Sequence, residues 1–182
     1  MKRYLGFAGL VLCAGALQAQ MGGMAAGVAA EAKQGYNQIK TNIAAAADAM
    51  PEANYSFKPV PEEMSFGQWV GHFADTQIGI CSRLNGQQKT LGAAQKTSKA
   101  DLVEALKESF TECDSAYNAI TDANASEMVA AGRGQRSRIG ALAGNTAHDN
   151  ECYGSMAVYL RLKGIVPPST ASRGGMMNMK KQ

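Results

Sequence analysis

Apolar residues recur at spacings of three and four along four stretches of the chain, which is the pattern of helices that each bury one face. Glycine or proline follows the last apolar position of the first, second and fourth stretches, as is usual where a helix ends. The pattern predicts helices over residues 28–50, 65–84, 98–120 and 137–163.

Two of these helices carry recognisable start signals. Ser65 is followed three residues later by Gln68, which predicts a reciprocal capping box, and Ser98 is followed by Asp101 in the first turn. Strand-forming residues are sparse, and no glycine-rich phosphate loop follows a strand. The sequence therefore predicts an all-α protein, a four-helix bundle with one long connection, in which residues 122–137 form a loop.

The length of 182 residues corresponds to one domain. We expect a signal peptide at residues 1–19, a flexible lead-in at 20–27, the bundle at 28–168, and a disordered tail at 169–182, where periodicity is absent.

The first residues have the order of charges and apolar residues of a secretory signal. Two basic residues precede an apolar run from Tyr4 to Leu17, and Ala19 stands at a cleavage point. The run is short for a membrane anchor, and acylation of Cys13 fits poorly because Leu12 replaces the small residue that is required there. We expect a periplasmic or secreted protein without stable membrane insertion after cleavage.

The charge balance argues against a nucleic-acid partner. The formal net charge is +3, and loss of Lys2 and Arg3 with the signal lowers it to +1. Nucleic-acid binding needs a concentrated basic face, which a charge this small does not indicate.

The candidate chemistry centres on the only two histidines. His148 and Cys152 are four residues apart on the last predicted helix and so face one point, and His72 joins them if the second and fourth helices are neighbours. Two imidazoles and a thiolate suit a divalent ion, zinc first and nickel or iron as alternatives, with one position open to water. The competing interpretation is a structural histidine pair beside a small buried cysteine.

Two stretches stand out in the sequence: YSFKPVPEEMSFGQWVGHFAD at 55–75 and HDNECYGSMAVYLRLKGIVPP at 148–168. They resemble the entry to the second helix and the last helix of the DinB-like superfamily, and the resemblance covers residues 28–168. It implies a bundle of four helices that often forms a homodimer and carries a three-histidine metal site at one end. Relatives include thiol-cofactor-dependent isomerases and transferases.

The resemblance assigns His72 and His148 to the first and second metal ligands of the family. Cys152 stands where the third histidine is normal, so the site is either retained with altered chemistry or weakened and lost. A thiolate lowers the positive charge of a metal relative to imidazole and makes bound water less acidic.

Carboxylates surround these residues in the sequence. Asp75, three residues after His72, could orient that imidazole, with a surface carboxylate as the alternative. Glu151 could support the site or act as a base, although Asp149, Asn150 and Glu151 fit a solvated helix face better.

Three cysteines remain after signal cleavage. Cys81 is nine residues after His72 and therefore faces away from the candidate site, whereas Cys113 is central in the third apolar stripe. We expect a disulfide between Cys81 and Cys113, with Cys152 left over; two free buried thiols are the alternative.

Taken together, the residues and the resemblance favour an exported metal-dependent enzyme, a hydrolase or thiol transferase that acts on a small substrate. The alternative is a non-catalytic periplasmic binding or structural module whose metal site has degraded.

Overall fold

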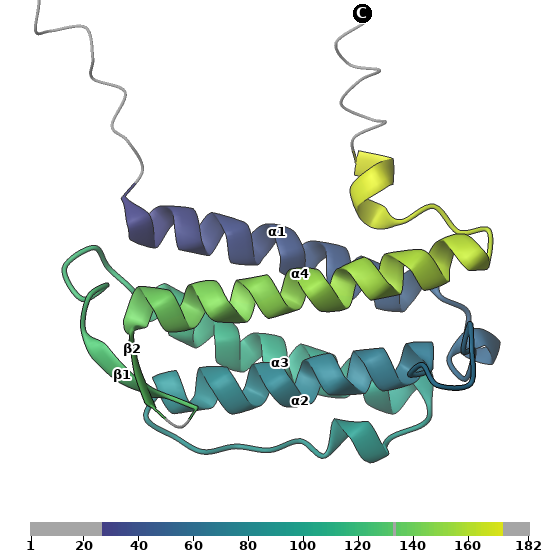
Figure 1. The fold of residues 1–182 in the computed structure, drawn as a ribbon, viewed down its shortest axis with the longest axis horizontal. Coiled ribbons are helices and arrows are strands. Elements are labelled where there is room, and N and C mark those ends of the chain that lie inside the picture. The colour runs from purple at the N-terminus through teal and green to yellow at the C-terminus, as the bar shows by residue number, and fades with distance from the viewer. Residues whose placement is uncertain (1–26, 133, 173–182) are drawn as a thin grey trace, which may run out of the picture.

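The computed structural model describes residues 27–132 and 134–172, and it confirms an all-α four-helix bundle (Figure 1). The predicted signal peptide and almost all of the lead-in lie outside the described residues. The four long helices are α1 (Val28–Ala49), α2 (Phe66–Leu84), α3 (Lys99–Ala119) and α4 (Arg138–Leu162).

The helices run up, down, down and up. Lys99 at the start of α3 donates to the carbonyl of Met50 just after α1 (2.9 Å), and Lys33 near the start of α1 donates to Asn118 at the end of α3 (3.4 Å). Residues 85–98 return the chain along the bundle between α2 and α3, with one short 3-10 helix, η2 (Ala93–Gln95). The two parallel pairs, α1 with α4 and α2 with α3, pack into a bundle in which α2 also lies against α4.

Local polar contacts fix where the helices begin. The Ser65 hydroxyl accepts from the Gln68 amide (3.2 Å) while Gln68 Oε1 accepts from the Ser65 amide (2.7 Å), so the predicted capping box is confirmed. Ser98 caps α3 and Ser137 caps α4 in the same manner, each accepting an amide three residues on. These caps satisfy amides that would otherwise have no partner in the first turn.

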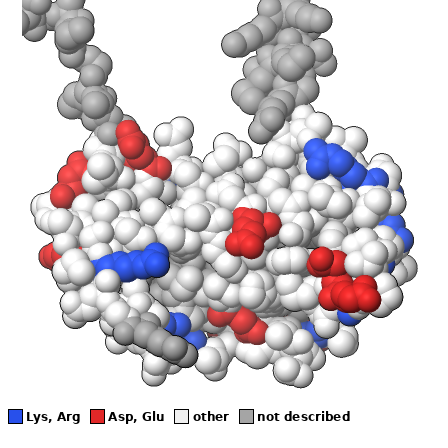
Figure 2. Space-filling view, in the orientation of Figure 1, with Lys and Arg blue, Asp and Glu red and all other residues white. Residues whose placement is uncertain are grey.

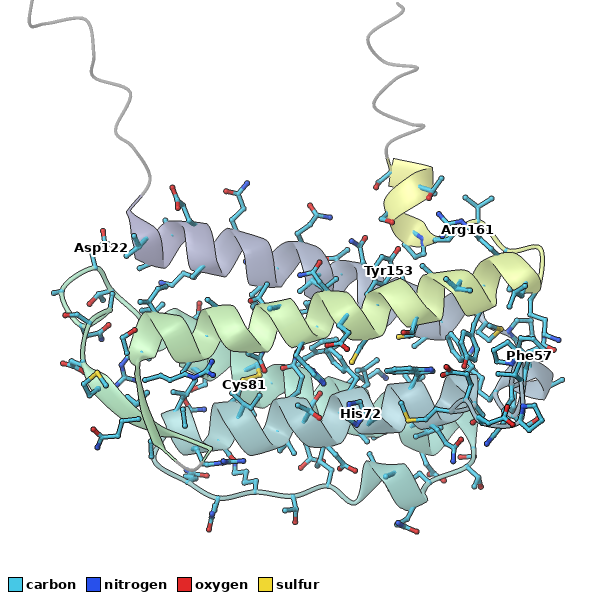
Figure 3. All side chains as sticks on the ribbon, in the orientation of Figure 1. Phe57, His72, Cys81, Asp122, Tyr153 and Arg161 are labelled. Carbon is cyan, nitrogen blue, oxygen red and sulfur yellow. A yellow bond between two sulfur atoms is a disulfide. The ribbon has the colours of Figure 1, made fainter. Side chains whose placement is uncertain are left out.

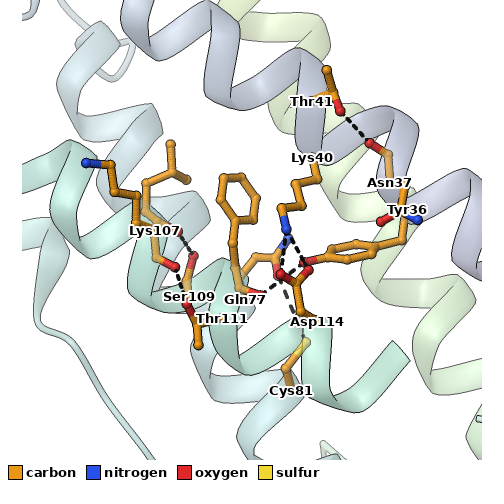
Figure 4. Close-up of polar contacts among 12 residues, drawn as sticks. Tyr36, Asn37, Lys40, Thr41, Gln77, Cys81, Lys107, Ser109, Thr111 and Asp114 are labelled. Atoms are coloured by element: carbon orange, nitrogen blue, oxygen red, sulfur yellow. Dashed lines mark hydrogen bonds and ion pairs between the residues drawn. The ribbon is translucent and has the colours of Figure 1, made fainter. Parts of the chain in front are cut away.

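Aromatic stacking and an ion pair hold α1 against α3. The rings of Tyr36 and Tyr117 stack with centroids 4.0 Å apart. The Tyr36 hydroxyl donates to Asp114 (2.9 Å), and Lys40 pairs with the same carboxylate at 2.6 Å (Figure 4). Burial and the nearby Asp114 carboxylate both raise the pKa of Tyr36, so this hydroxyl stays protonated.

The predicted loop over 122–137 contains an antiparallel hairpin instead. Its strands are β1 (Met128–Ala131) and β2 (Gly134–Ser137), with Val129 opposite Arg136, and Gly132 takes the positive φ of 61° that the turn requires. The expectation of a loop was wrong here because the second strand is almost entirely polar and exposed, so it has no alternation of apolar residues.

The start of the expected disordered tail is also ordered. Residues 168–172 form a helical turn that begins at the second of two prolines, a position where the missing amide proton is not needed. The Tyr153 hydroxyl donates to Ser169 Oγ and accepts the Ser169 amide, both at 2.9 Å, which holds this turn against α4. The prediction of disorder from residue 169 is therefore wrong as far as residue 172.

Within the described residues, none of the helices combines the length and the apolar character needed to span a bilayer.

Candidate metal centre

The two histidines and Cys152 meet between α2 and α4. His72 lies two turns into α2, and His148 and Cys152 lie one turn apart near the middle of α4 (Figure 3 labels His72). The three side chains form the one group of potential metal ligands found among the described residues. They lie part-way along the bundle, not at its end as the resemblance implied.

Two of the three separations between donor atoms match those around a tetrahedral ion. His72 Nε2 and His148 Nε2 are 3.1 Å apart, Cys152 Sγ is 3.7 Å from His148 Nε2, and no two donors are more than 4.8 Å apart. Zinc bond lengths of about 2.0–2.1 Å to nitrogen and about 2.3 Å to sulfur require separations of about 3.4 Å between nitrogens and about 3.6 Å from nitrogen to sulfur. The His72–His148 and His148–Cys152 separations lie within a few tenths of an ångström of these values, and the chemistry of the donor set suits the ion.

The candidate site is closed on its core side, where Cys152 lies, and open on its surface side, where the two histidines lie. Cys152 is 1% exposed, whereas both histidines are half-buried at the surface between the helices. Three protein donors leave one position of a tetrahedron free, which is the arrangement of catalytic rather than structural zinc sites.

The protonation of the two α4 residues follows from burial. Burial lowers the pKa of His148, and the neighbouring His72 lowers it further, so His148 is neutral and able to bind a metal. Burial, with smaller contributions from the Asp149 and Glu151 charges, raises the pKa of the Cys152 thiol to about 12. A thiol of this kind becomes a thiolate only beside a cation that offsets the desolvation.

An aromatic residue bounds the site on the α2 side. The Trp69 ring meets His72 edge-on with centroids 6.0 Å apart. Trp69 Nε1 donates to the Tyr159 hydroxyl (3.3 Å), which in turn donates to the carbonyl of Met64 (2.6 Å). This chain of hydrogen bonds fixes Trp69 and limits the rotation of His72 on that side.

The two carboxylates predicted to support the site, Asp75 and Glu151, form no hydrogen bond with its three side chains. Both oxygens of Asp75 accept backbone amides of η2, from Ala93 at 2.9 Å and from Ala94 at 2.8 Å, so Asp75 anchors the crossover segment and forms no hydrogen bond with His72. Glu151 is exposed and acts on the site only through its charge, which opposes the lowering of the pKa of His148.

Asp149 is fully buried, which corrects the expectation of a solvated face. Its Oδ2 accepts from Gln77 (2.9 Å) and from Asn145 (3.0 Å), while its Oδ1 has no partner. Burial raises the pKa of Asp149 to about 8, against the lowering effect of Gln77. The sequence did contain a signal: Asn145, Asp149 and Cys152 follow one another at spacings of four and three, the period of a buried stripe.

The predicted Cys81–Cys113 disulfide is present and joins α2 to α3, with Cα atoms 4.9 Å apart. Cys152 is the free cysteine among the described residues, as expected. Cys81 lies closer than His72 to the hairpin end of α2 (Figure 3), and the disulfide sits in the second core cluster with Tyr36 and Tyr117.

The fold and these residues define a class: a four-helix-bundle protein with a candidate His-His-Cys metal centre between two of its helices. The family model described as the DinB superfamily matches residues 36–155, about two-thirds of the chain, and this range includes His72, His148 and Cys152. The chain belongs to the DinB superfamily.

Comparison with solved structures supports the fold. A DinB-like protein from Bacillus cereus ATCC 10987 superimposes with a TM-score of 0.65 at 17% sequence identity, covering 75% of this chain and 93% of that chain. At this identity the likeness shows the fold alone. Comparison with curated proteins gives no match.

Proposed function

We propose that this DinB-superfamily protein binds one divalent metal ion through His72, His148 and Cys152 and uses it to act on a small substrate, as a hydrolase or thiol transferase. The convergence of three donor atoms around one point, with a fourth position open toward the surface, carries the proposal. Fold alone would not support it, because one fold serves many functions.

Each residue has a defined part. His72 and His148 supply imidazole nitrogens from two different helices, and packing of α2 against α4 sets their separation of 3.1 Å. Cys152 supplies a sulfur that the core shields from solvent and from oxidants. A bound ion at this point would act as a Lewis acid and lower the pKa of a water in the open position.

The donor set favours zinc over the alternatives. Two imidazoles and one thiolate match the borderline-soft character of zinc and its tetrahedral geometry, although nickel and iron also accept these ligands. The thiolate reduces the effective charge of the ion, so we expect a less acidic metal-bound water than in a three-histidine site.

A second function has its own support. A non-catalytic binding or structural module is favoured by the buried, protonated state of Cys152, whose pKa burial raises to about 12. Among the described residues, no carboxylate forms a hydrogen bond with His72, His148 or Cys152, which also favours it. In that case the 3.1 Å contact is a simple hydrogen bond between two imidazoles.

Export is part of the proposal. The Cys81–Cys113 disulfide supports an oxidising compartment, the periplasm or the exterior, since structural disulfides are rare in the cytosol. A homodimer, common in the superfamily according to the resemblance, stays a prediction that sedimentation of the purified chain would test.

Metal content measured on untagged protein tests the proposal. We expect about one zinc per chain, and we expect a chelator to lower the melting temperature because an ion that binds only the folded state stabilises it. His148→Ala should abolish metal uptake while the helical circular dichroism persists, whereas Asn150→Ala, an exposed change two residues away, should leave metal content unchanged.

Cys152→His separates the two functions. If the site is a working metal centre with altered chemistry, this change to the residue expected from the family pattern should keep one metal per chain and make its bound water more acidic. Wild-type protein without metal, together with a Cys152→His variant that binds it, would show that the site has degraded and would support the non-catalytic alternative.

A further inference from the structure

A hollow of about 340 Å³ lies beside the candidate metal centre, between the second half of α2, the hairpin and the first half of α4. Its volume is in the range of small-molecule sites. The charged residues in its walls are both arginines, and the rest are apolar, small or neutral. The walls are formed by Ile80, Arg83, Leu84, Ala130, Ala131, Gly132, Arg136, Ala141, Gly144 and Asn145.

The two arginines are not neutralised by any described residue. Arg83 Nε donates to the carbonyl of Gly79 (2.6 Å), and neither Arg83 nor Arg136 takes part in an ion pair with the residues that the structure describes. Gly144 lets the Arg136 guanidinium lie against α4, because a Cβ there would be 3.2 Å from Arg136 Nη1. Two unpaired guanidiniums over an apolar wall attract an anion, which a carboxylate can satisfy through paired hydrogen bonds.

The hollow and the metal centre share the groove between α2 and α4. Gly144 is one turn before His148 on α4, which is about 6 Å along the helix, and Ile80 is two turns after His72 on α2, which is about 12 Å. Residues spaced by three and four lie on one face of a helix, so both groups face the same groove. In Figure 2 basic side chains (blue) lie at both ends of the visible face, including the end that carries the hairpin in Figure 1.

A second hollow, of about 470 Å³, lies on the other side of Arg83, but its other charged groups are already committed. Asp75 accepts two backbone amides, and Lys89 pairs with Glu112 at 2.6 Å. Of these two hollows, the one beside the hairpin is therefore the one whose charged side chains are both cations without an ion pair to a described residue.

We propose that the hollow lined by Arg83 and Arg136 binds the carboxylate of a small amphipathic organic acid, whose apolar body lies along Ile80, Leu84 and Ala141. This inference names the substrate class of the site described above, so in its catalytic meaning it rests on the proposed function. The binding itself depends only on the hollow and its two arginines.

Calorimetric titration of the full chain with 3-phenylpropionate tests the inference, with neutral 3-phenylpropanamide as the matched ligand. We expect the carboxylate to bind at least about ten-fold more tightly than the amide, since charge-assisted hydrogen bonds are about twice as strong as neutral ones. Arg83→Gln and Arg136→Gln should each weaken carboxylate binding about five- to ten-fold. Arg161→Gln, an exposed change near the other end of α4, is the control and should leave the affinity unchanged.

A filling variant checks the location independently of charge. Gly144→Leu places a side chain where Arg136 Nη1 now lies and should abolish binding while the protein keeps its helical content. Equal affinity for acid and amide, or carboxylate binding unaffected by both arginine changes, would overturn the inference.

Titrations with and without chelator keep the two proposals separate. If the protein takes up no metal but binds the carboxylate through the two arginines, the binding site in the hollow is supported and the metal-dependent function is refuted. If the protein takes up metal but does not bind the carboxylate, the metal site is supported and the binding site in the hollow is refuted.

Discussion

Replacement of the buried Asp149 by asparagine should change how the stability of the protein depends on pH. Asp149 is completely buried, and burial raises its pKa from 3.8 to about 8 in the folded protein. Between these values the folded chain holds a proton that the unfolded chain has lost. The stability associated with this group is therefore fully present below about pH 4 and is lost as the pH rises through about 8.

The magnitude follows from proton linkage. One proton held by the folded state alone lowers the free energy of unfolding by about 1.4 kcal/mol for each unit of rising pH. From about pH 5 to about pH 7.5 the loss for the wild-type chain is on the order of 3 kcal/mol. The amide that replaces the carboxyl in Asp149→Asn cannot ionise, so the stability of this variant relative to wild type should rise by about this amount over the same interval.

Urea unfolding at several pH values, with chelator present so that metal binding does not contribute, measures the difference. Glu104→Gln is a suitable control because the Glu104 side chain is 77% exposed. The free energy of unfolding of this variant should follow that of wild type at every pH. If the curves for wild type and Asp149→Asn stay parallel from pH 5 to 7.5, Asp149 is ionised in the folded state and the reasoning is refuted.

Two further predictions concern packing and the disulfide. Gly71→Ala should lower the free energy of unfolding by about 1–3 kcal/mol, because its Cβ would lie 2.7 Å from a backbone carbonyl oxygen of η2. Gly154→Ala, whose Cβ would have nothing within 4 Å, should raise the free energy of unfolding by up to about 1 kcal/mol. Equal effects of the two changes in urea unfolding would contradict this. Replacing both Cys81 and Cys113 by Ser should cost about 3–4 kcal/mol, since the bond closes a loop with a sequence separation of 32, and a melting temperature unchanged from that of the oxidised protein would count against it.

The helices were predictable because their signals are local. An apolar stripe, a serine before the first turn and a glycine after the last one act within a few residues, and Ser65 with Gln68 forms the contacts that their spacing implies. The hairpin lacks such signals, since its second strand places exposed residues on both faces. Its pairing depends on where α3 ends and α4 begins, which is a property of the bundle.

The candidate site was predictable in its members but not in its surroundings. Two histidines, one of them four residues before a cysteine, leave few ways to assemble a ligand set, so His72, His148 and Cys152 followed from spacing and resemblance. The role of Asp75 could not be predicted, because its partners at Ala93 and Ala94 belong to a segment without periodicity. Which backbone approaches a carboxylate is decided by the path of the crossover.

Asp149 shows why a charged residue in a helix is hard to place from sequence. A step of one residue turns the helix by about 100°, so Asp149 and His148 cannot share a direction. The buried stripe of α4 passes through Asn145, Asp149 and Cys152, which leaves His148 at the edge of the stripe, half-exposed and able to reach His72. The buried carboxyl and the accessible imidazole are thus two results of one helix rotation. A rotation that buried His148 would expose Asp149 and carry the histidine out of reach of His72.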